Sequence, residues 1–329
     1  MKLNYQQFKK KLFAHIETWR PYTVLWCGLL SLTGACLIYN GLPPISHIFL
    51  VLGIPIMGWI AGLYLSDYLD AHLDMIQKAH RPIPSGRIHP TEALIIGALF
   101  AGIGLSLTIL LGIQNLILAF CASFLVYSYA RFTKPRGILG NINRGALAVV
   151  SFLFGVLSFN IPLYNIPLSI WILCIVFLLH DMNTNLVGTL RDMQSDKEGG
   201  YNTISVMYGL KKTVYLAIFL SITWFLLILS IITLLYTPTY LFSVLIFIDG
   251  ALVLLIGVHL RKLVKTYSRK KALTIHKYFV LERITLASAI ISLMVPLNIS
   301  LTVYITSLIL TGLFQITLRN QYEFSKWEL

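Results

Sequence analysis

The sequence contains few charged residues for its length. Asp, Glu, Lys and Arg make up 12% of the 329 residues, whereas a soluble globular domain carries about 25%. Hydrophobic residues make up 57%, and the mean hydropathy is +0.77. Apolar runs of roughly 20 residues recur along the chain, and they lack the every-second-residue alternation of a β-barrel strand. The composition therefore argues against an ordinary soluble protein and predicts a polytopic helical membrane protein.

Three further absences narrow the class of protein. The four cysteines, Cys27, Cys36, Cys121 and Cys174, lie inside apolar runs without the spacing of metal ligands or of a disulfide framework, so we expect them to act as small apolar residues. No G-x-x-x-x-G-K-[ST] segment occurs, which argues against a nucleoside triphosphatase. The N-terminus has no small-residue cleavage site after a short apolar core, so a cleaved signal peptide is not expected.

The apolar runs predict an all-α bundle. The ten candidate spans cover residues 22–40, 45–65, 92–112, 114–130, 145–160, 165–187, 213–235, 240–260, 281–297 and 298–318. No linker or soluble insertion interrupts them, so residues 1–329 are interpreted as one domain. Within it, residues 1–20 are predicted to contain a helix on the membrane surface, because Leu3, Phe8 and Leu12 stand among lysines.

The basic residues indicate an orientation for this bundle. All 26 Lys and Arg residues fall on one side of the predicted spans. The turns on the other side contain none and cover residues 41–44, 113, 161–164, 236–239 and 297–299. The basic side has long polar loops at residues 66–91, 131–144, 188–212 and 261–280. Because positively charged loops stay in the cytoplasm, we expect an integral protein of the cytoplasmic membrane, and the net charge of +13 needs no nucleic-acid partner.

Two acidic clusters stand where spans meet the basic loops. The stretch SDYLDAHLD places Asp67, Asp70 and Asp74 at i, i+3 and i+7, and RDMQSD places Asp192 and Asp196 at i and i+4. On a helix each set shares one face. A solvated helix end is the plain alternative for one carboxylate. Five such carboxylates repel one another unless cations neutralise them, and carboxylates are the ligands that Mg²⁺ prefers.

A basic turn follows the first cluster. In QKAHRPIPSGRI, Lys78, Arg81 and Arg87 supply cationic donors, and Pro82 with Gly86 favours a fixed turn. Carboxylates for a metal beside arginines for phosphate oxygens together indicate a metal–diphosphate site.

These segments resemble the motifs of the UbiA superfamily of intramembrane prenyltransferases. SDYLDAHLD with HRPIPSGRI resembles the first aspartate motif, and GTLRDMQSDKEGGYNTISVMYG resembles the second. WRPYTVLW and VYSYARFTKPRGILGN also fit, so the resemblance extends from about residue 19 to 210. Ser66, Gln77 and Ala79 depart from the usual residues of the first motif, which puts the fine geometry of the site in question.

The resemblance implies a bundle around a lipid-open central cavity that binds an isoprenoid diphosphate and Mg²⁺. It assigns the metal and the catalytic role to Asp67, Asp70, Asp74, Asp192 and Asp196. The residues predicted to bind substrate are Lys78, Arg81, Arg87, Tyr127, Lys134, Asn141, Asp181, Asn185, Arg191 and Lys197. The family has nine spans, whereas the charges here favour ten, so nine or ten remains open.

Several polar residues inside the spans have two interpretations each. Asp181 extends the second acidic stripe and either faces the cavity or joins a buried network, with His180 as a possible partner. Asp249 lies in mid-span, which implies a partner, a neutral form or a cavity acid. Tyr127 and Tyr129 are either interfacial aromatics or faces for a carbocation.

The resemblance implies an enzyme that moves a polyprenyl group from an isoprenoid diphosphate to a lipophilic or aromatic acceptor. The acceptor is an aromatic ring, a lipid glycerol or a tetrapyrrole acid, and membrane lipids surround the protein. A terpene cyclase on the same scaffold would ionise the same donor and close it on itself. A carrier of isoprenoid lipids would bind the donor without releasing diphosphate.

Overall fold

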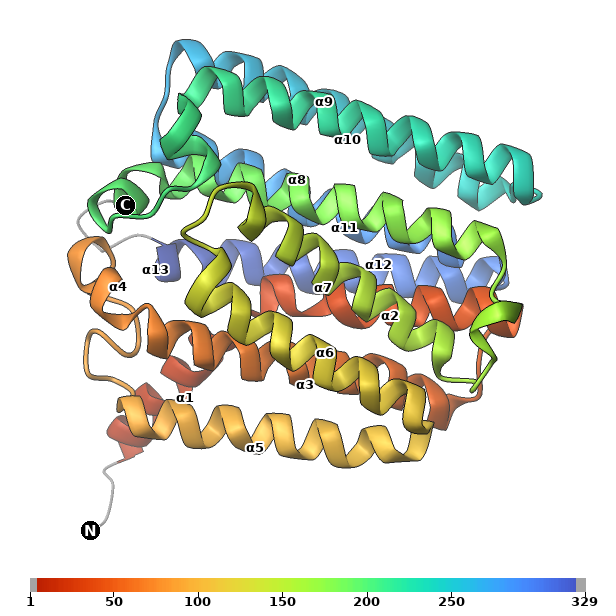
Figure 1. Ribbon diagram of the computed structural model, residues 1–329, viewed down its shortest axis with the longest axis horizontal. Coiled ribbons are helices and arrows are strands. Elements are labelled where there is room, and N and C mark those ends of the chain that lie inside the picture. The colour runs from red at the N-terminus through yellow and green to blue at the C-terminus, as the bar shows by residue number, and fades with distance from the viewer. Residues whose placement is uncertain (1–4, 324–329) are drawn as a thin grey trace.

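The computed structural model describes residues 5–323 and is a bundle of long helices (Figure 1). The ten long helices are α2 (Pro21–Tyr39), α3 (Ile45–Leu69), α5 (Pro90–Thr108), α6 (Ile113–Ser128), α7 (Ile138–Leu157), α8 (Leu168–Glu198), α9 (Ile204–Leu235), α10 (Tyr240–Lys265), α11 (Arg269–Ile291) and α12 (Leu297–Phe314). The short helices are α1 (Tyr5–Trp19), α4 (Ala71–Gln77) and α13 (Asn320–Glu323). Single turns of other helix types are η1 (Ile109–Leu111), η2 (Tyr129–Thr133), η3 (Leu163–Asn165) and η4 (Gln315–Arg319). The only strand-like pairing in the described chain is a bridge between Arg136 and Asn202.

Nine helices of the described chain are long and apolar enough to cross a membrane. The tenth long helix, α11, is excluded by its charged residues, yet it packs against α2, α8, α10 and α12. Its Glu282 and Arg283 are buried inside the bundle. Helices α11 and α12 are separate elements, with Pro296 as the N-cap of α12. The described chain therefore has ten long helices rather than nine with a broken last one.

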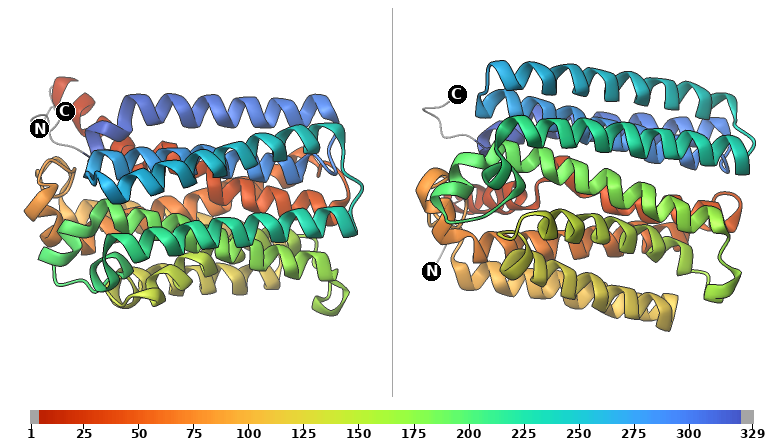
Figure 2. Two further views of the ribbon diagram at one scale, coloured as in Figure 1. Left: turned by 90° about the horizontal axis from the view of Figure 1, so that it is seen from above. Right: turned by 45° about the horizontal axis from the view of Figure 1, so that its top comes forward.

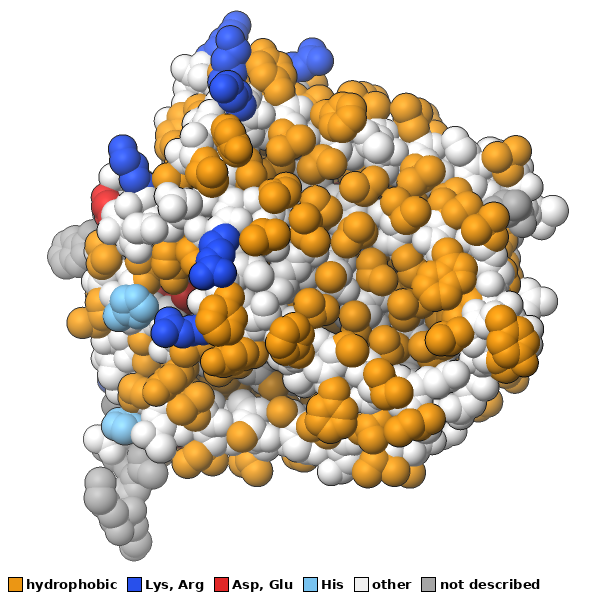
Figure 3. Space-filling model, in the orientation of Figure 1, with side chains coloured by type: hydrophobic (Ala, Val, Ile, Leu, Met, Phe, Trp, Pro, Cys, Tyr) orange, Lys and Arg blue, Asp and Glu red, His pale blue; other side chains and the backbone are white. Residues whose placement is uncertain are grey.

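The two ends of the bundle differ (Figure 2). One end carries α1, α4, α13 and the basic loops, and the other has short turns (Figures 1 and 2). Seen as a surface, Lys and Arg side chains gather at the first end, and hydrophobic side chains cover the rest of the visible face (Figure 3). This division fits a membrane protein whose polar chemistry is concentrated at one end.

Helix α1 is amphipathic, as the sequence predicts, and is fastened to the bundle. Its Phe8 and Leu12 are exposed. His15 Nδ1 lies 2.8 Å from the hydroxyl of Tyr64, and Lys11 pairs with Glu92 at 2.9 Å. Leu3 and the other residues of the segment 1–4, like Lys326 in 324–329, lie outside the described residues.

Small residues bring the central helices close together. A side-chain carbon at Gly155 of α7 would overlap the carbonyl oxygen of Ser31 in α2, and one at Gly34 of α2 would overlap that of Phe152 in α7. Trp26, Phe152 and Phe177 pack beside this contact. Close backbone approach through small residues is how membrane helices gain packing contacts, and both α2 and α7 contribute residues to the cavity described next.

The helices reach further into the polar end than the apolar runs suggest. Helix α7 begins at Ile138 rather than 145, and α8 continues to Glu198 rather than ending near 187. Helix α9 begins at Ile204 and bends at Gly209, where φ is +76°. The expected loop 188–212 is therefore mostly helical, because hydropathy marks the depth of the lipid and not the end of the hydrogen-bonded helix.

Candidate active site

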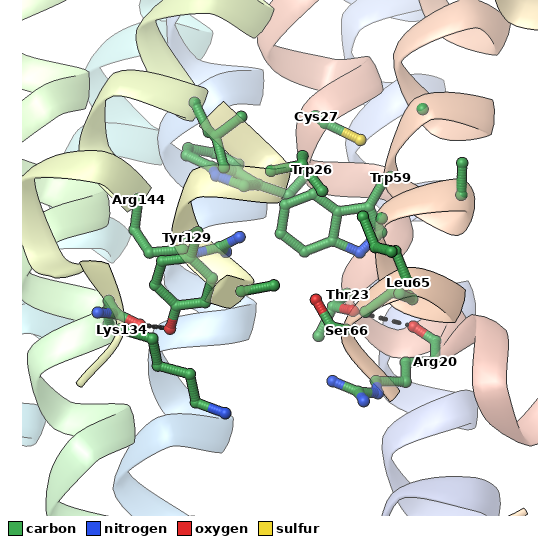
Figure 4. A pocket seen from close by; sticks show the side chains of 18 of the residues that line it. Arg20, Thr23, Trp26, Cys27, Trp59, Leu65, Ser66, Tyr129, Lys134 and Arg144 are labelled. Atoms are coloured by element: carbon green, nitrogen blue, oxygen red, sulfur yellow. Dashed lines mark hydrogen bonds between the residues drawn. The ribbon is translucent and has the colours of Figure 1, made fainter. Parts of the chain in front are cut away.

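A cavity of about 570 Å³ lies between α2, α3, α5, α6, α7, α8 and α11. Leu30, Ile54, Leu105 and Phe154 contribute apolar surface to its wall. Charged side chains gather where α4 and the basic loops close one end. Figure 4 shows Arg144, Lys134 and Tyr129 on one side of this space and Arg20, Ser66 and Trp59 on the other. The cavity thus combines an apolar chamber with a charged mouth.

The first aspartate segment is not one continuous helix. Helix α3 ends at Leu69, Asp70 lies between the helices, and α4 begins at Ala71. Backbone hydrogen bonds from Asp70 to Ser66 and from Asp74 to Asp70 bridge this junction, but the three aspartates expected on one face have different surroundings. Asp70 and Asp74 line the cavity, whereas Asp67 is not among its lining residues.

Asp67 is held in a buried contact behind the cavity wall. It is 4% exposed and forms an ion pair with Arg20. The hydroxyl of Tyr322 donates to its two carboxylate oxygens at 3.0 and 3.1 Å. Its neighbours are thus a cation from the start of α2 and a phenol from α13.

Asp70 and Asp74 each face a cation from the basic loops. The ammonium of Lys134 lies 2.5 Å from Asp70, and the guanidinium of Arg81 donates to both oxygens of Asp74 at 3.0 and 2.8 Å. Burial alone would raise the pKa of Asp74, but Arg81 and Lys78 outweigh it and hold this pKa below its usual value. Burial alone would lower the pKa of Lys134, but Asp70 outweighs it and the net change is upward. Asp74 is therefore ionised in the structure.

The second aspartate segment lies on the last turns of α8. Asp192 accepts from Lys78 at 3.1 Å and pairs with its neighbour Arg191. Asp196 accepts from the hydroxyl of Thr203 at 3.2 Å. Burial and the charge of Arg81 lower the pKa of Lys78 below its usual value, while Asp192 acts in the opposite direction. The Lys78–Asp192 pair brings the two acidic segments to the same mouth of the cavity.

The donor set at this mouth suits a hard cation. Asp70, Asp74, Asp192 and Asp196 all line the cavity and offer only carboxylate oxygens, which suit Mg²⁺ better than a transition metal. Within residues 5–323 no three Asp, Glu, His or Cys side chains converge on one point. The pairings above explain this, because these carboxylates are directed toward lysine, arginine or hydroxyl groups. Holding a cation would require some of them to exchange partners.

Most of the predicted substrate-binding residues line the cavity. Lys78, Arg81, Lys134, Asn141, Asp181, Asn185 and Arg191 do so. Asn141 donates to the carbonyl of Met182 at 3.2 Å, and Asn185 accepts from the hydroxyl of Tyr129 at 3.1 Å.

Three predicted residues lie elsewhere. Arg87 binds Glu17 of α1, with its Nη1 2.5 Å from a carboxylate oxygen. Tyr127 is 47% exposed and packs against Phe132, so Tyr129 is the tyrosine at the cavity. Lys197 is exposed and absent from the lining, because it points away from the face that carries Asp192 and Asp196.

The buried acids of the spans separate into two groups. Asp181 lines the cavity, accepts from the indole of Trp26 at 3.1 Å and lies 3.7 Å from Arg144. His180 is not its partner, since its Nε2 lies 2.8 Å from Glu282 instead. Asp249 is fully buried, has Glu282 as its acidic neighbour and lies outside the cavity lining. Asp249 is therefore a buried acid beside Glu282, outside the residues that line the cavity.

Sequence reasoning missed several cavity residues. Arg20, Arg144, Arg283 and Arg319 were counted only as orienting charges, yet all four line the cavity, and so does Glu323. Arg144 and Arg283 lie near the ends of predicted spans, where a charge within an apolar helix was the available signal. For Glu323, which follows the last span by several residues, the sequence offered no such signal.

The cavity, its charged mouth and the helical bundle have counterparts among known proteins. The family model for the UbiA prenyltransferase family matches residues 24–281. A digeranylgeranylglyceryl phosphate synthase from Pyrococcus horikoshii is 30% identical over 217 residues, which are 66% of this chain and 76% of that protein. The corresponding enzyme of Korarchaeum cryptofilum is 33% identical over 215 residues, 64% of this chain and 73% of its own.

Solved structures share the fold. One, from work on digeranylgeranylglyceryl phosphate synthase in membranes, is 26% identical, covers 86% of this chain and 98% of its own, and has a TM-score of 0.62. The relatives are synthases and favour neither a terpene cyclase nor a carrier. The chain belongs to the UbiA prenyltransferase family and is a membrane-embedded prenyltransferase.

Proposed function

We propose that this enzyme moves a geranylgeranyl-type group from its diphosphate to a prenylated glyceryl phosphate, with Mg²⁺ bound at the two aspartate segments. The observation that supports this proposal most directly is the charged mouth at the end of the apolar chamber. Its acids are Asp70, Asp74, Asp192 and Asp196, and its cations are Lys78, Arg81, Lys134 and Arg191. The relatives named above make digeranylgeranylglyceryl phosphate. Removing one prenyl group from that product leaves a glyceryl phosphate with a free hydroxyl as the acceptor.

The donor would bind with its diphosphate at the charged mouth and its chain in the apolar chamber. A UbiA homologue from Archaeoglobus fulgidus has been solved with dimethylallyl diphosphate and Mg²⁺, and at 14% identity, 84% coverage of this chain and a TM-score of 0.60 it shares the fold. Here Asp70, Asp74, Asp192 and Asp196 would hold the metal, which supplies positive charge to the diphosphate oxygens. Lys78 and Arg81 would bind the remaining oxygens.

Bond cleavage follows from this charge distribution. The bond between C1 of the prenyl group and the diphosphate oxygen breaks, and its electron pair leaves with the diphosphate. Lys78, Arg81, Lys134 and Arg191 stabilise the negative charge that develops there. The aromatic rings of Tyr129 and Trp59 line the cavity, and such rings stabilise a nearby allylic cation.

Ether formation completes the reaction. The acceptor hydroxyl oxygen attacks C1, a carbon–oxygen bond forms, and the hydroxyl proton passes to the released diphosphate, the base nearest to the broken bond. The apolar wall keeps water from competing with the hydroxyl. The aspartates thus serve to hold the metal and the leaving group rather than to form a covalent intermediate.

The charged mouth would face the cytoplasm. The basic loops lie at the same end of the bundle as the aspartate segments (Figures 1 and 3), and basic loops are retained on the inner side of the cytoplasmic membrane. Mg²⁺ and the diphosphate head of the donor would then reach the mouth from the cytoplasmic side, while both prenyl chains remain in the bilayer.

Product analysis tests this proposal. Purified protein is incubated with Mg²⁺ and labelled geranylgeranyl diphosphate, with and without geranylgeranylglyceryl phosphate. We expect one diphosphate released for each dialkyl product, and release without acceptor at a small fraction of that rate. A cyclic hydrocarbon or alcohol formed without acceptor would contradict a transferase, and an exclusive preference for an aromatic acceptor would contradict a glyceryl phosphate.

A further inference from the structure

Three arginines form a second basic group inside the cavity, beyond the aspartate segments. Arg144 comes from α7, Arg283 from α11 and Arg319 from η4, and all three line the cavity. We call them the inner basic pocket. Arg283 is 3% exposed and Arg319 is fully buried. Arg283 lies within electrostatic range of Arg144 on one side and Arg319 on the other. Three guanidinium groups therefore share one region of low dielectric.

The positive charge of this pocket is only partly balanced by carboxylates of residues 5–323. Arg144 faces Asp181 at 3.7 Å, which is too long for a hydrogen bond. Asp181 is also the carboxylate that acts most strongly on Arg283. The buried Nε atoms of Arg283 and Arg319 have no hydrogen-bond partner among residues 5–323. Asp181 is thus shared by Arg144 and Arg283. Glu282 also acts on Arg283 and Glu323 on Arg319, but Glu282 faces His180 and Glu323 is paired with Arg191.

The neutral contacts of the pocket do not change this balance. Arg319 donates to Gln315 at 2.8 Å and to Nδ1 of His276 at 2.6 Å. Because arginine only donates, His276 accepts here and adds no negative charge. The guanidinium of Arg283 lies over the ring of Trp26 at 5.2 Å, and that of Arg144 over Trp59 at 4.6 Å. These aromatic faces hold the arginines in place while leaving hydrogen-bond donors for an anion.

The pocket is distinct from the diphosphate-binding mouth. Asp181, which faces Arg144, precedes Asp192 by eleven residues on the continuous helix α8. These two aspartates are therefore separated by about 16 Å along the helix axis. Figure 4 shows Arg144 on the opposite side of Tyr129 from Lys134. Arg319 lies nearer the mouth, within electrostatic range of Arg191 and Glu323. One diphosphate occupying Lys78, Arg81 and Lys134 would not neutralise Arg144 and Arg283 as well.

We propose that the inner basic pocket binds the phosphate monoester of the acceptor lipid, an inference that rests on the proposed function. A phosphate monoester carries a charge of about −1.5 to −2 at neutral pH, and its oxygens could accept from the unpartnered Nε groups of Arg283 and Arg319. On a prenylated glycerol phosphate the free hydroxyl lies within two carbons of the phosphate-bearing carbon. An anchored phosphate would therefore hold that hydroxyl beside the donor's C1. Planar guanidinium groups suit phosphate oxygens better than ammonium groups do.

Binding measurements with and without the phosphate test this assignment. Equilibrium binding of geranylgeranylglyceryl phosphate and of geranylgeranylglycerol is measured in detergent for the wild type, Arg283→Gln and Arg144→Gln. The matched control is Arg261→Gln on the exposed face of α10. We expect the wild type and the control to prefer the phosphorylated lipid, and each pocket variant to lose about tenfold to a hundredfold of that preference. Arg283→Lys keeps a charge and should retain part of it.

Kinetic measurements distinguish a failure of this proposal from a failure of the proposed function. In the pocket variants the acceptor KM should rise while the donor KM stays within about twofold. Equal loss of donor and acceptor affinity would place the inner arginines at the diphosphate and overturn the assignment. An unchanged phosphate preference would overturn it as well, even if transfer to the glyceryl lipid is intact. A wild type that binds the phosphorylated lipid through these arginines but transfers nothing to it would refute the proposed function alone.

A second, independent observation concerns the C-terminal segment, which lies beyond the family match at residues 24–281. The ring of Tyr322 in α13 lies between two guanidinium groups, with Arg20 at 4.4 Å and Arg81 at 4.2 Å from its centre. Its hydroxyl donates to Asp67, and His80 Nε2 donates to its carbonyl at 3.1 Å. Glu323 pairs with Arg191 at 2.9 Å and lies 3.8 Å from Arg81.

We infer that Tyr322 is a positioning residue that holds Arg81 toward the donor diphosphate. Among residues 5–323 the ion-pair partners of Arg81 are Asp74 at 2.8 Å and Glu323 at 3.8 Å, and Asp74 is a residue that would turn to the metal. The Tyr322 ring keeps the guanidinium in place without competing for it as a carboxylate would. The ring holds Arg20 in the same way, and the hydroxyl binds Asp67 at the back of the mouth.

Paired substitutions test this role. Tyr322→Phe keeps the ring between the two arginines, whereas Tyr322→Leu removes it, and Tyr240→Leu at an 83% exposed position is the control. We expect Tyr322→Leu to raise the donor KM about tenfold, with the acceptor KM unchanged, and Tyr322→Phe to restore most of the loss. Equal changes in both KM values together with a lower melting temperature would show a merely structural role and overturn the inference.

Discussion

The ammonium nitrogen of Lys78 lies 3.1 Å from a carboxylate oxygen of Asp192, and this ion pair joins residues 114 positions apart in the sequence. It connects the segment after α4 to the last turns of α8, and both side chains are largely buried. A diphosphate and its metal would take over both partners, since each offers the charge that the ligand needs. The pair is therefore interpreted as the resting arrangement of the donor site.

Replacement of Lys78 by Gln should impair use of the donor. With one cation removed from the leaving diphosphate, we expect kcat/KM for the donor to fall by about a hundredfold, as for loss of one preorganised donor to a developing charge. The matched control is Lys197→Gln, because Lys197 is exposed and does not line the cavity. Steady-state kinetics at saturating acceptor measure both. An equal loss in the two variants would show that Lys197 acts at the site.

Substitution of Tyr129 and of Tyr127 should have different effects on kcat. Tyr129 donates to Asn185 at 3.1 Å beside the cavity, whereas Tyr127 is 47% exposed. Tyr129→Phe loses this hydrogen bond, worth about 1 kcal/mol, and should reduce kcat about fivefold. Tyr127→Phe should leave kcat unchanged. A larger effect at Tyr127 than at Tyr129 would show that the face of α6 carrying Tyr127, and not Tyr129 of η2, lines the cavity.

The close contact of α2 and α7 predicts where a methyl group is not tolerated. A side-chain carbon at Gly155 overlaps the backbone carbonyl of Ser31, whereas one at Gly257 meets nothing within 4 Å. Gly155→Ala must separate two helices, so we expect a loss of about 1–3 kcal/mol and a clearly lower melting temperature in detergent. Gly257→Ala should melt at or slightly above the wild-type temperature. Equal melting temperatures would refute the contact.

The orientation of the bundle is testable with single cysteines. Exposed Cys121 is first replaced by Ala, and Ser85→Cys and Tyr164→Cys then report on opposite ends. A membrane-impermeant maleimide should label Tyr164→Cys in intact cells and Ser85→Cys only after lysis. The reverse pattern would place the charged mouth outside the cytoplasm.

The sequence predicted the helical class and most of the site because both leave local signals. Spans follow from apolar runs, and the acidic segments follow from spacing within a few residues. The basic turn after Asp74 likewise pointed to Arg81, which lines the cavity. The division of the first aspartate segment into α3 and α4 was harder to predict, because no proline or glycine stands at Asp70 to mark it.

The remaining errors concern which way a side chain points. Lys197 adjoins Asp196, and Tyr127 is two residues from Tyr129, yet helix rotation directs each away from its neighbour's face. The roles of Arg283, Arg319 and Glu323 depend on where α11 and the segment after α12 pack. Such tertiary contacts between distant segments cannot be deduced from local pattern.

The central claim is that the two aspartate segments bind the donor diphosphate through Mg²⁺, and calorimetric titration with a non-hydrolysable thiolodiphosphate analogue of the donor tests it most directly. The account predicts tight binding with Mg²⁺, a loss of at least tenfold with EDTA, and the same loss in Asp70→Asn and Asp192→Asn even with Mg²⁺ present. Binding that is indifferent to EDTA and to both substitutions would contradict it.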